Sequence, residues 1–362
     1  MNRNKNYYAI LMAGGVGSRF WPVSKKKFPK QFHDILGTGE TLIQRTFNRL
    51  ARLIPEENIL ILTNGMYNDL VKQQLPNVTD NQIVLEPVMR NTAPCILLSA
   101  LKIQKQNEDA MMVVAPSDHW IEDEDAFVND LQTAFDACQR QDDLLMTLGI
   151  QPTFPHTGYG YIQHQTNPSS KVNKVVNFKE KPDYNTAKEY LSDGNYLWNA
   201  GIFVWSAKAI TGEFRKLVPE MYEIFEEGLP YYNTTQEQRF INESYEDAEN
   251  ISIDYAIMEK AENVCVIPAS FDWNDLGSWG ALHEELDHDE NENVFINSKS
   301  LTENASNNIV RTLGNKLVVL KDIDNYIIVE DEEVLLIYPR GDEQGIKNVR
   351  NLAKDKFGED LI

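Results

Sequence analysis

The chain has 362 residues, more than a single hydrophobic core usually holds, which favours one large domain and a smaller one. Lys and Arg number 34 against 55 Asp and Glu, and the net charge of −21 repels a phosphate backbone or an anionic membrane surface. We therefore expect no nucleic acid and no membrane among its partners, and a hydrophobic content of 42% excludes a disordered chain.

The first half of the chain alternates short apolar runs with longer amphipathic ones. Residues 1–8 are largely polar and no later run reaches the length of a membrane span, so we expect no signal peptide and a cytoplasmic protein. The β-α-β-α order predicts a parallel, doubly wound sheet in an α/β fold. Strands are predicted over Tyr7–Ala13, Ile59–Thr63, Gln82–Glu86 and Met111–Ala115, and helices over Thr41–Ile54, Asn91–Gln106 and Glu124–Arg140.

From about Leu144 the pattern loosens into strands joined by Gly- and Pro-containing turns. Helical blocks are predicted over 183–193 and within 206–260, and together with these strands they form an inserted mixed region over the sheet. The acidic stretch His283–Asn293 is predicted to be a solvated linker.

A domain boundary is therefore predicted near residue 290. The expected domains are residues 1–290, which carry the chemistry, and residues 291–362, a small β unit that ends in a helix near 347–357. The three cysteines, at positions 95, 138 and 265, lie far apart without CxxC spacing, so we expect reduced thiols and no zinc site.

A glycine-rich loop follows the first predicted strand, in the sequence LMAGGVGSRFWPVSKKKFPKQ. The backbone N–H groups of such a loop can approach an anion closely, and Arg19 and Lys30 add two cations, so the loop is predicted to bind a triphosphate. The loop lacks the Gly-Lys-Ser/Thr of a P-loop and the third glycine of a dinucleotide fingerprint. The alternative is a plain strand-to-helix turn with surface basic residues. The loop residues predicted to contact the nucleotide are Gly14, Gly15, Gly17, Ser18, Arg19 and Lys30.

The loop motif GGxGSR, followed by WPxS and PKQ, resembles that of the sugar-nucleotide pyrophosphorylases, specifically the mannose-1-phosphate guanylyltransferases. The resemblance implies a Rossmann-like, doubly wound nucleotidyltransferase domain, a small C-terminal domain of the left-handed β-helix type, and a homodimer. It also implies GTP and mannose 1-phosphate as substrates, GDP-mannose and pyrophosphate as products, and Mg²⁺ as cofactor. Six further motifs carry it in collinear order: EPVMRNTAPC (86–95), PSDH (116–119), TGYGYI (157–162), FKEKP (178–182), WNAGIF (198–203) and FDWNDLGSW (271–279).

By this resemblance Asp118 and Asp275 hold the magnesium ion. The chemistry is suitable, because Mg²⁺ takes one or two carboxylates together with substrate phosphates. Asp118 follows a predicted strand, so it lies at the carboxyl end of the sheet where such folds bind ligands. The alternative is that each aspartate caps a helix, Asp118 before Trp120 and Asp275 before Gly277.

The resemblance assigns recognition of the nucleotide base to Glu86, which ends the third predicted strand. Guanine offers adjacent N1–H and N2–H donors, and one carboxylate can accept both. Arg90, Asn91 and Thr92 resemble the nucleoside-contacting stretch of the family, although Asn91 or Thr92 could equally cap the following helix.

The resemblance assigns the remaining motifs to the hexose. Their glycines allow close approach of the backbone, their carboxylate and amide can bind hydroxyls, and the ammonium of Lys181 can neutralise the sugar phosphate. A tight turn and a solvated charged strand are the alternatives. Ala200 and Asn274 depart from the residues usual in the family. The predicted sugar-binding residues are Gly158, Tyr159, Gly160, Glu180, Lys181, Asn199 and Gly201.

The implied reaction is in-line attack of a sugar-phosphate oxygen on the α-phosphorus of GTP. Arg19, Lys30, Asp118, Lys181 and Asp275 are its predicted catalytic residues; the nucleophile is already an anion, so positioning and charge neutralisation suffice without a base. Two rivals remain: the same fold with another nucleotide or sugar, and an inactive subunit that senses GDP-mannose. With six scattered histidines and an end at Ile362, no isomerase domain of the cupin type is expected.

Overall fold

The computed structural model describes residues 3–362, which divide into two compact units. Unit 1 comprises the described part of Met1–Gly14 together with Thr46–Ser117 and Ile121–Trp273. Unit 2 comprises Gly15–Arg45, Asp118–Trp120 and Asn274–Ile362. Each unit has its own hydrophobic cluster of buried side chains.

A nine-stranded sheet forms the centre of unit 1, in the order β3-β2-β1-β4-β8-β5-β9-β7-β6. The first four strands are parallel and confirm the predicted doubly wound sheet. Beyond them the sheet is mixed, because β8 runs antiparallel to both β4 and β5. The strands are β1 (Tyr7–Met12), β2 (Ile59–Asn64), β3 (Ile83–Glu86), β4 (Met111–Pro116), β5 (Leu145–Ile150), β6 (Tyr161–Gln165), β7 (Asn173–Lys179), β8 (Tyr196–Ser206) and β9 (Val264–Pro268).

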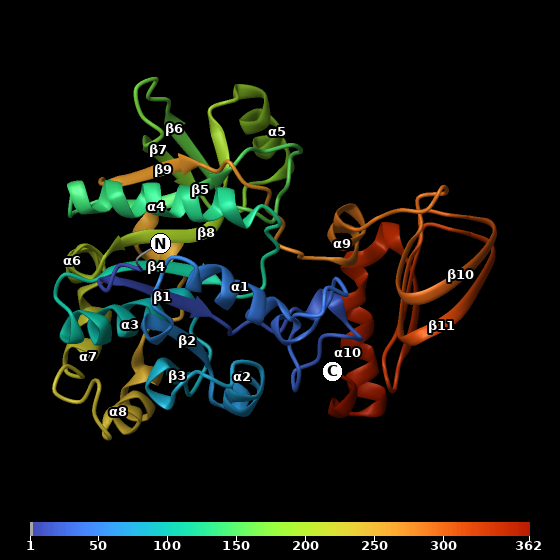
Figure 1. Cartoon of the computed structure of the whole chain (residues 1–362), viewed down its shortest axis with the longest axis horizontal. Helices are drawn as coiled ribbons and strands as arrows, with labels where there is room; N and C mark the ends of the chain where they lie inside the picture. Colours follow the sequence, from blue (N-terminus) through green and yellow to red (C-terminus); the bar gives the residue numbers. More distant parts are fainter. Residues whose placement is uncertain (1–2) are drawn as a thin grey trace. The chain divides into compact units, whose positions relative to one another are not determined.

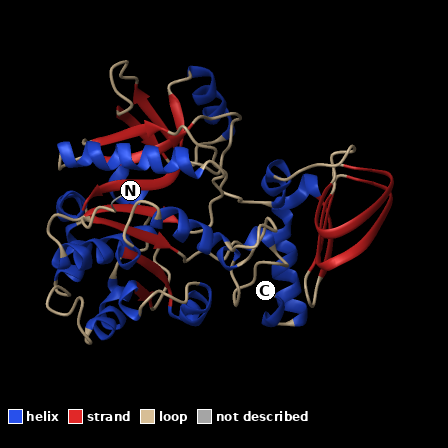
Figure 2. Cartoon of the chain, in the orientation of Figure 1, coloured by secondary structure: helices blue, strands red, loops and turns tan. Residues whose placement is uncertain are grey.

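The central strands are apolar throughout because both faces of the sheet are covered. Five residues of β1 are buried, and helices flank the strands (Figures 1 and 2). The predicted helical block within 206–260 is divided into three α-helices and a π-helical turn, η7 (Asp254–Met258). The helices are α1 (Leu42–Ala51), α2 (Asn68–Gln74), α3 (Thr92–Gln106), α4 (Glu124–Arg140), α5 (Tyr184–Asp193), α6 (Ala207–Leu217), α7 (Pro219–Glu226) and α8 (Glu237–Ser244).

Unit 2 contains a four-stranded sheet of β10 (Val294–Ser306), β11 (Ile309–Asp324), β12 (Tyr326–Glu330) and β13 (Leu335–Pro339). Strands β10, β11 and β12 follow one another in sequence, yet each pairs with the next in parallel. Partners along most of these ladders, such as Ser298 with Lys316 and Ile309 with Ile327, lie 18 residues apart, so the chain makes one coil per pairing. Asn and Asp residues with positive φ recur at the same 18-residue step, at 297 and 315, 304 and 322, and 307 and 325.

Two helices of unit 2, α9 (Trp279–Glu285) and α10 (Ile346–Phe357), complete its structure. The C-terminal segment of this unit begins at Asn274 rather than near residue 290, and the unit also includes the glycine-loop segment. The physical reason is a shared core, in which Phe20 of the loop segment contacts Trp279 with ring centroids 5.0 Å apart. The boundary of the compact units therefore differs from the predicted domains of residues 1–290 and 291–362.

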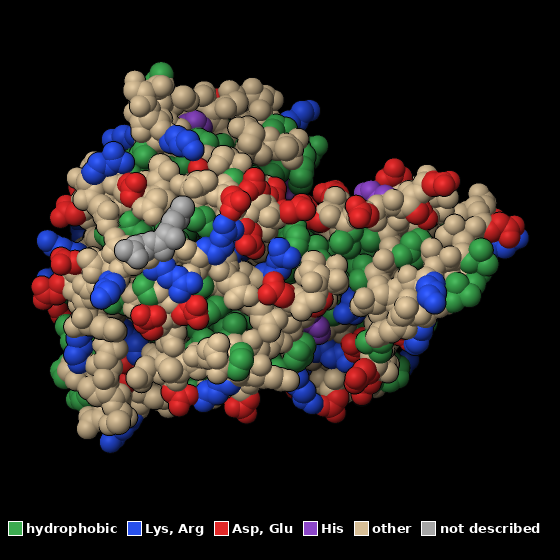
Figure 3. Space-filling model, viewed as in Figure 1, with side chains coloured by type: hydrophobic (Ala, Val, Ile, Leu, Met, Phe, Trp, Pro, Cys, Tyr) green, Lys and Arg blue, Asp and Glu red, His purple; other side chains and the backbone are tan. Residues whose placement is uncertain are grey.

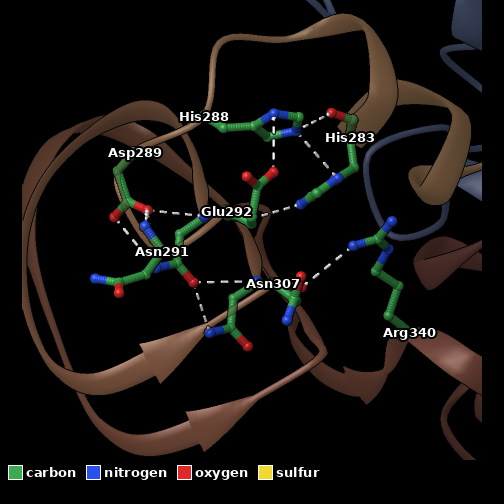
Figure 4. Close-up of polar contacts among 9 residues, drawn as sticks. His283, His288, Asp289, Asn291, Glu292, Asn307 and Arg340 are labelled. Carbon is green, nitrogen blue, oxygen red and sulfur yellow. Dashed lines mark hydrogen bonds and ion pairs between the residues drawn. The ribbon is translucent and has the colours of Figure 1, made fainter.

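The acidic stretch His283–Asn293 is mostly exposed, as predicted for a solvated segment, but it begins within α9 and its two ends are buried. His283 is 4% exposed and Asn293 is 1% exposed. Figure 4 shows the polar contacts responsible: Asp289 Oδ1 accepts the backbone N–H groups of Asn291 and Asn293, and an imidazole nitrogen of His283 contacts the carbonyl of Glu292 at 2.9 Å. These bonds hold the backbone that follows α9 in a defined turn, while most side chains of the stretch stay exposed to solvent.

Acidic and basic side chains are interspersed over the face drawn in Figure 3, without a large basic patch. Over residues 3–362, no helix combines the length and the apolar character that crossing a membrane requires. The three cysteines are unpaired; Cys95 and Cys138 are buried and Cys265 is half-buried.

Candidate functional site

Unit 2 contains a cavity of about 250 Å³ at the glycine loop. Six of the predicted site residues line it, together with His119 and Lys347, which the sequence did not single out. Its lining therefore combines cations, carboxylates and loop backbone in one place. The predicted residues at the cavity are Gly17, Ser18, Arg19, Lys30, Asp118 and Asp275.

Gly17 sets the shape of the loop. Its φ of 65° is in the left-handed region, and it immediately precedes the single 3-10 turn η1 (Ser18–Phe20). A Cβ atom at this position would lie 2.6 Å from Cβ of Lys30. By contrast, a Cβ atom at Gly15 would meet no atom within 4 Å. Position 17 therefore requires glycine for packing, whereas position 15 leaves open space beside the backbone.

Lys30 connects the two predicted metal ligands. Its side chain is 3% exposed, and Nζ lies 3.1 Å from Oδ2 of Asp118 and 2.7 Å from the carbonyl oxygen of Asp275. Burial favours the neutral acid, but the Lys30 ammonium and His119 outweigh it and hold the pKa of Asp118 below its ordinary value. The Asp118 carboxylate is therefore ionised and 34% exposed at the cavity.

Neither aspartate caps a helix, so that alternative was wrong. The N-cap of α4 is Asp123, whose side chain accepts from Ala126 N, and the N-cap of α9 is Ser278. Asp275 instead turns back on its own chain, with Oδ1 accepting from Gly277 N at 2.9 Å. A Cβ atom at Gly277 would lie 2.6 Å from Oδ2 of Asp275, so a side chain there would displace the carboxylate.

Two further cations border the cavity. Arg19 donates from Nη1 to the carbonyl oxygen of Gly277 at 3.2 Å, which fixes the guanidinium while leaving other N–H groups for a ligand. Lys347 reaches the cavity from α10. Its position in an amphipathic terminal helix resembles that of an ordinary surface lysine, which is why the sequence carried no signal for it.

The donor set at this cavity fits Mg²⁺. Asp118 and Asp275 offer hard carboxylate oxygens, and Mg²⁺ typically takes one or two such ligands while substrate phosphates and water complete its shell. Within residues 3–362, no group of three or more His, Cys, Asp or Glu side chains is arranged to hold a metal. A metal at this cavity would therefore depend on phosphate oxygens of a bound substrate.

Glu86, the predicted base reader, is at the end of β3 in unit 1 and is 8% exposed. Tyr245 donates a short hydrogen bond from its hydroxyl to Oε1 of Glu86. Burial raises the pKa of Glu86 to about 7, although the Tyr245 hydrogen bond opposes the rise. Gly14 is adjacent, since a Cβ atom there would lie 3.9 Å from Oε2. Tyr245 was not predicted, because a lone Tyr in a helical block carries no signal.

The stretch from Arg90 to Thr92 is anchored to a segment far along the chain. Arg90 donates from Nη2 to the carbonyl oxygen of Glu246 at 2.6 Å, and Thr92 Oγ1 accepts from Ile253 N at 2.9 Å. Asn91 is the N-cap residue of α3 by position, but its side chain makes no capping bond and contacts Asn250 instead. These three side chains are therefore held by protein contacts.

The predicted sugar residues converge in unit 1. A Cβ atom at Gly160 would lie 3.3 Å from Cβ of Asn199 and would also press on Oε2 of Glu180. Glu180 pairs with Lys181, whose Nζ lies 2.6 Å from Oε1. Burial lowers the pKa of Lys181, but the Glu180 carboxylate outweighs it, so that the net pKa is raised. Gly201 has a φ of 67° and donates its N–H to Oδ1 of Asn199 at 3.1 Å.

Tyr159 lies in an aromatic cluster of the same unit. Its ring stacks on His156 with centroids 3.7 Å apart, and it meets Trp198 and Trp273 edge to face. Gly158 donates its N–H to Nδ1 of His156 at 3.1 Å. The motif TGYGYI is therefore more than a tight turn, since it presents an aromatic surface beside the glycines.

Asp254 is a further residue that the sequence did not indicate. It begins the π-helical turn η7, and its Oδ1 accepts from Nδ2 of Asn199 at 2.9 Å. Burial and the nearby Glu180 carboxylate raise the pKa of Asp254 to about 6. In the sequence, Asp254 lies in an IDYA stretch that has no neighbouring glycine or basic residue, so no motif marked it as a site residue.

The comparisons with known proteins agree with this arrangement. A family model described as nucleotidyl transferase matches residues 8–292. A mannose-1-phosphate guanylyltransferase of Klebsiella pneumoniae is 34% identical over 353 residues, which cover 95% of this chain and 73% of the relative. The alginate biosynthesis protein AlgA of Pseudomonas aeruginosa is 34% identical over 347 residues, covering 94% of this chain and 70% of AlgA.

Solved structures agree as well. The crystal structure of a mannose-1-phosphate geranyltransferase from Thermus thermophilus matches with a TM-score of 0.87 and 30% identity, covering 96% of this chain and 99% of that one. That of a mannose-6-phosphate isomerase from Helicobacter pylori matches with a TM-score of 0.61 and 27% identity, over 74% of this chain and 99% of the other. The chain belongs to the nucleotidyl transferase family and, within it, to the mannose-1-phosphate guanylyltransferases.

Proposed function

We propose that this chain transfers a guanylyl group from GTP to α-D-mannose 1-phosphate, giving GDP-mannose and pyrophosphate. The observation that carries the proposal is the cavity of unit 2, which brings Arg19, Lys30, Asp118 and Asp275 together beside the glycine loop. Family membership supplies the reaction type, and this cavity has the charges that a triphosphate and a divalent cation require.

The chemical step is a displacement at the α-phosphorus. An anionic oxygen of mannose 1-phosphate forms the new P–O bond, the bond to the bridging oxygen of the β-phosphate breaks, and pyrophosphate leaves with that electron pair. Because the nucleophile is already an anion, the residues need only orient it and neutralise charge. Arg19 would bind the departing phosphates, and the loop N–H groups near Gly15 and Gly17 would approach them closely.

Lys30 would have a second task besides the expected phosphate contact. Its ammonium is held by Asp118 and by the Asp275 carbonyl, so it keeps the two acidic segments together and has one N–H left for a phosphate. Asp118 and Asp275 would hold Mg²⁺, which when bound supplies positive charge at the phosphates. Lys347 and His119 would add to the charge at the same cavity.

The residues of unit 1 would provide the base and sugar specificity. Glu86 would accept from the two adjacent donors of guanine with its carboxylate, while Arg90, Asn91 and Thr92 support the nucleoside. Gly160, Glu180 and Asn199 would bind hydroxyls of mannose, and Lys181 would steer its phosphate. Tyr159 and Gly158 would offer an aromatic face and close backbone to the hexose.

The experiment is pyrophosphate release from the purified chain with Mg²⁺. GTP, ATP, UTP, CTP and dTTP are each combined with the 1-phosphates of mannose, glucose and N-acetylglucosamine. A dominant rate for GTP with mannose 1-phosphate that is abolished by EDTA supports the proposal. Dominance of another pair overturns the substrates, and absence of turnover with every pair favours an inactive GDP-mannose sensor.

The quaternary and C-terminal predictions also enter as proposals. The 18-residue step of the β10 to β12 pairing supports a β-helix, which we assign the left-handed form expected from the family. Exposed apolar side chains on this sheet, among them Leu301, Leu317 and Val319, support a homodimer formed through it. Light scattering at micromolar concentration that gives the monomer mass would refute the homodimer.

A further inference from the structure

We propose that Asp254 is a positioning residue that fixes Asn199 as a hydrogen-bond donor to one hydroxyl of the sugar 1-phosphate. The inference rests on the proposed function and names a residue that neither the motifs nor the family resemblance assigned. It follows from the hydrogen bonds of the Asn199 amide.

Two contacts fix the orientation of this amide. Oδ1 of Asn199 accepts from Gly201 N at 3.1 Å, and Nδ2 donates to Oδ1 of Asp254 at 2.9 Å. Rotating the amide by 180° would set its N–H groups against the Gly201 N–H and its oxygen against the Asp254 carboxylate. Only the observed orientation satisfies both neighbours.

The same contacts determine what the amide can offer to a ligand. The Gly201 N–H occupies one lone pair of Oδ1, and one of the two Nδ2 hydrogens is bound to Asp254. The half-buried Asn199 therefore keeps one N–H that can donate to a hydroxyl oxygen.

The surroundings of this N–H suit a sugar hydroxyl. Gly160 packs against both Asn199 and Glu180, and a larger residue there would collide with the Glu180 carboxylate. The cluster thus places acceptors on Glu180 and Asp254 close to the one donor of Asn199. A hydroxyl both donates and accepts, so a pair of acid and amide side chains matches it.

Asp254 is held firmly enough for a positioning role. It begins the π-helical turn η7, a type of turn that is frequent at functional sites. The preceding residue, Ile253, donates its backbone N–H to Thr92 Oγ1 at the start of α3, so the turn is anchored to the sheet-packed helix.

The test uses the full chain with two variants, Asp254→Asn and the exchange Asp254→Asn with Asn199→Asp. The single change removes the charge that orients Asn199, and we expect the KM for mannose 1-phosphate to rise at least tenfold while the KM for GTP stays within twofold. The exchange restores a hydrogen bond between the two positions but leaves two acceptors at position 199. We expect its melting temperature to recover while the KM for mannose 1-phosphate stays raised.

The control is Glu243→Gln, which removes one acid paired with Arg239 on the surface of α8. Its kinetic constants should equal those of the wild type. The role of Asp254 is overturned if Asp254→Asn leaves the KM for mannose 1-phosphate unchanged, or if the exchange restores this KM. A wild type without turnover on any sugar 1-phosphate overturns the proposed function itself, and calorimetry with mannose 1-phosphate on wild type and Asp254→Asn then decides separately whether Asp254 supports sugar binding.

Discussion

Nζ of Lys30 lies 3.1 Å from Oδ2 of Asp118, so a buried ammonium of the loop segment is paired with a carboxylate 88 positions further along the chain. The same ammonium donates to the carbonyl oxygen of Asp275 at 2.7 Å. A single side chain thus fixes the spacing of both candidate metal ligands. The pairing gives Asp118 a structural contact as well as its proposed catalytic one.

Asp118→Asn should therefore lower both turnover and stability, with turnover the more affected. The isosteric amide removes the charge opposite Lys30, and loss of a hydrogen bond to a charged group costs about 1–3 kcal/mol of unfolding free energy. Loss of a preorganised charge at the reacting phosphates lowers kcat by about 10²–10³-fold. Urea unfolding and pyrophosphate release measure the two effects. The exposed Glu122→Gln serves as control, and a variant with wild-type turnover would remove Asp118 from the mechanism.

Two glycines of the loop should respond differently to alanine. Gly17→Ala forces a side chain into the left-handed region and against Cβ of Lys30, so we expect a loss of about 2–4 kcal/mol of unfolding free energy. Gly15→Ala meets no neighbouring atom, and its unfolding free energy should stay within about 0.5 kcal/mol of the wild type. Thermal melts of both variants check this. If Gly17→Ala and Gly15→Ala lose the same unfolding free energy, the packing of Gly17 against Lys30 does not decide how the loop tolerates alanine.

The sequence predicted the parallel strands well, because an apolar run such as Met111–Pro116, between the helices α3 and α4, has few other solutions. It did not predict that β8 enters the sheet antiparallel between β4 and β5. A buried run such as that of β8 carries no information on strand direction. The sequence also could not show that the glycine-loop segment belongs to unit 2 with Trp279, because this depends on contacts between residues about 260 positions apart.

Sequence motifs indicated several of the residues that line the cavity, whereas residues outside any motif gave no such indication. The cavity brings Gly17, Arg19 and Lys30 together with both aspartates, because glycine turns and strand ends leave patterns in sequence. Tyr245 and Asp254 belong to helical or irregular segments of ordinary composition. Their roles come from hydrogen bonds to Glu86 and Asn199, which only the folded chain displays.

Glu86 should make stability depend on pH. Its folded pKa of about 7 lies above its ordinary value of 4.5, so between these values the folded state binds more protons than the unfolded state. Its contribution to stability is full below about pH 4.5 and is lost as the pH rises through 7. Relative to the wild type, Glu86→Gln should therefore gain about 3 kcal/mol of unfolding free energy from pH 4.5 to pH 8.

Urea unfolding of both proteins across this range measures that difference. Glu57→Gln, which removes an exposed acid of the same unit, is the control and should give a flat difference. A difference between Glu86→Gln and wild type that does not change with pH would mean that folding does not raise the pKa of Glu86.

The hydrogen bond from Tyr245 should control base preference. This bond lowers the pKa of Glu86, so Tyr245→Phe raises it further and leaves more of the carboxyl protonated near neutral pH. A protonated carboxyl has lost an acceptor for the N1–H and N2–H groups of guanine. We expect the preference for GTP over ATP, as a ratio of kcat/KM, to fall about tenfold at pH 6.5 and much less at pH 8.5.

The control for this effect is Tyr222→Phe, since Tyr222 is also buried and donates to a carboxylate, that of Glu226 on the same helix α7. Its base preference should equal that of the wild type at both pH values. If Tyr245→Phe loses the same preference for GTP at pH 6.5 and 8.5, the cause is repacking around the phenyl ring. A change in the pKa of Glu86 would alter the preference only at pH values near that pKa. An unchanged preference at pH 6.5 would mean that guanine is not read through Glu86, and the base would then have to be recognised by the backbone of the loop or by the stretch from Arg90 to Thr92.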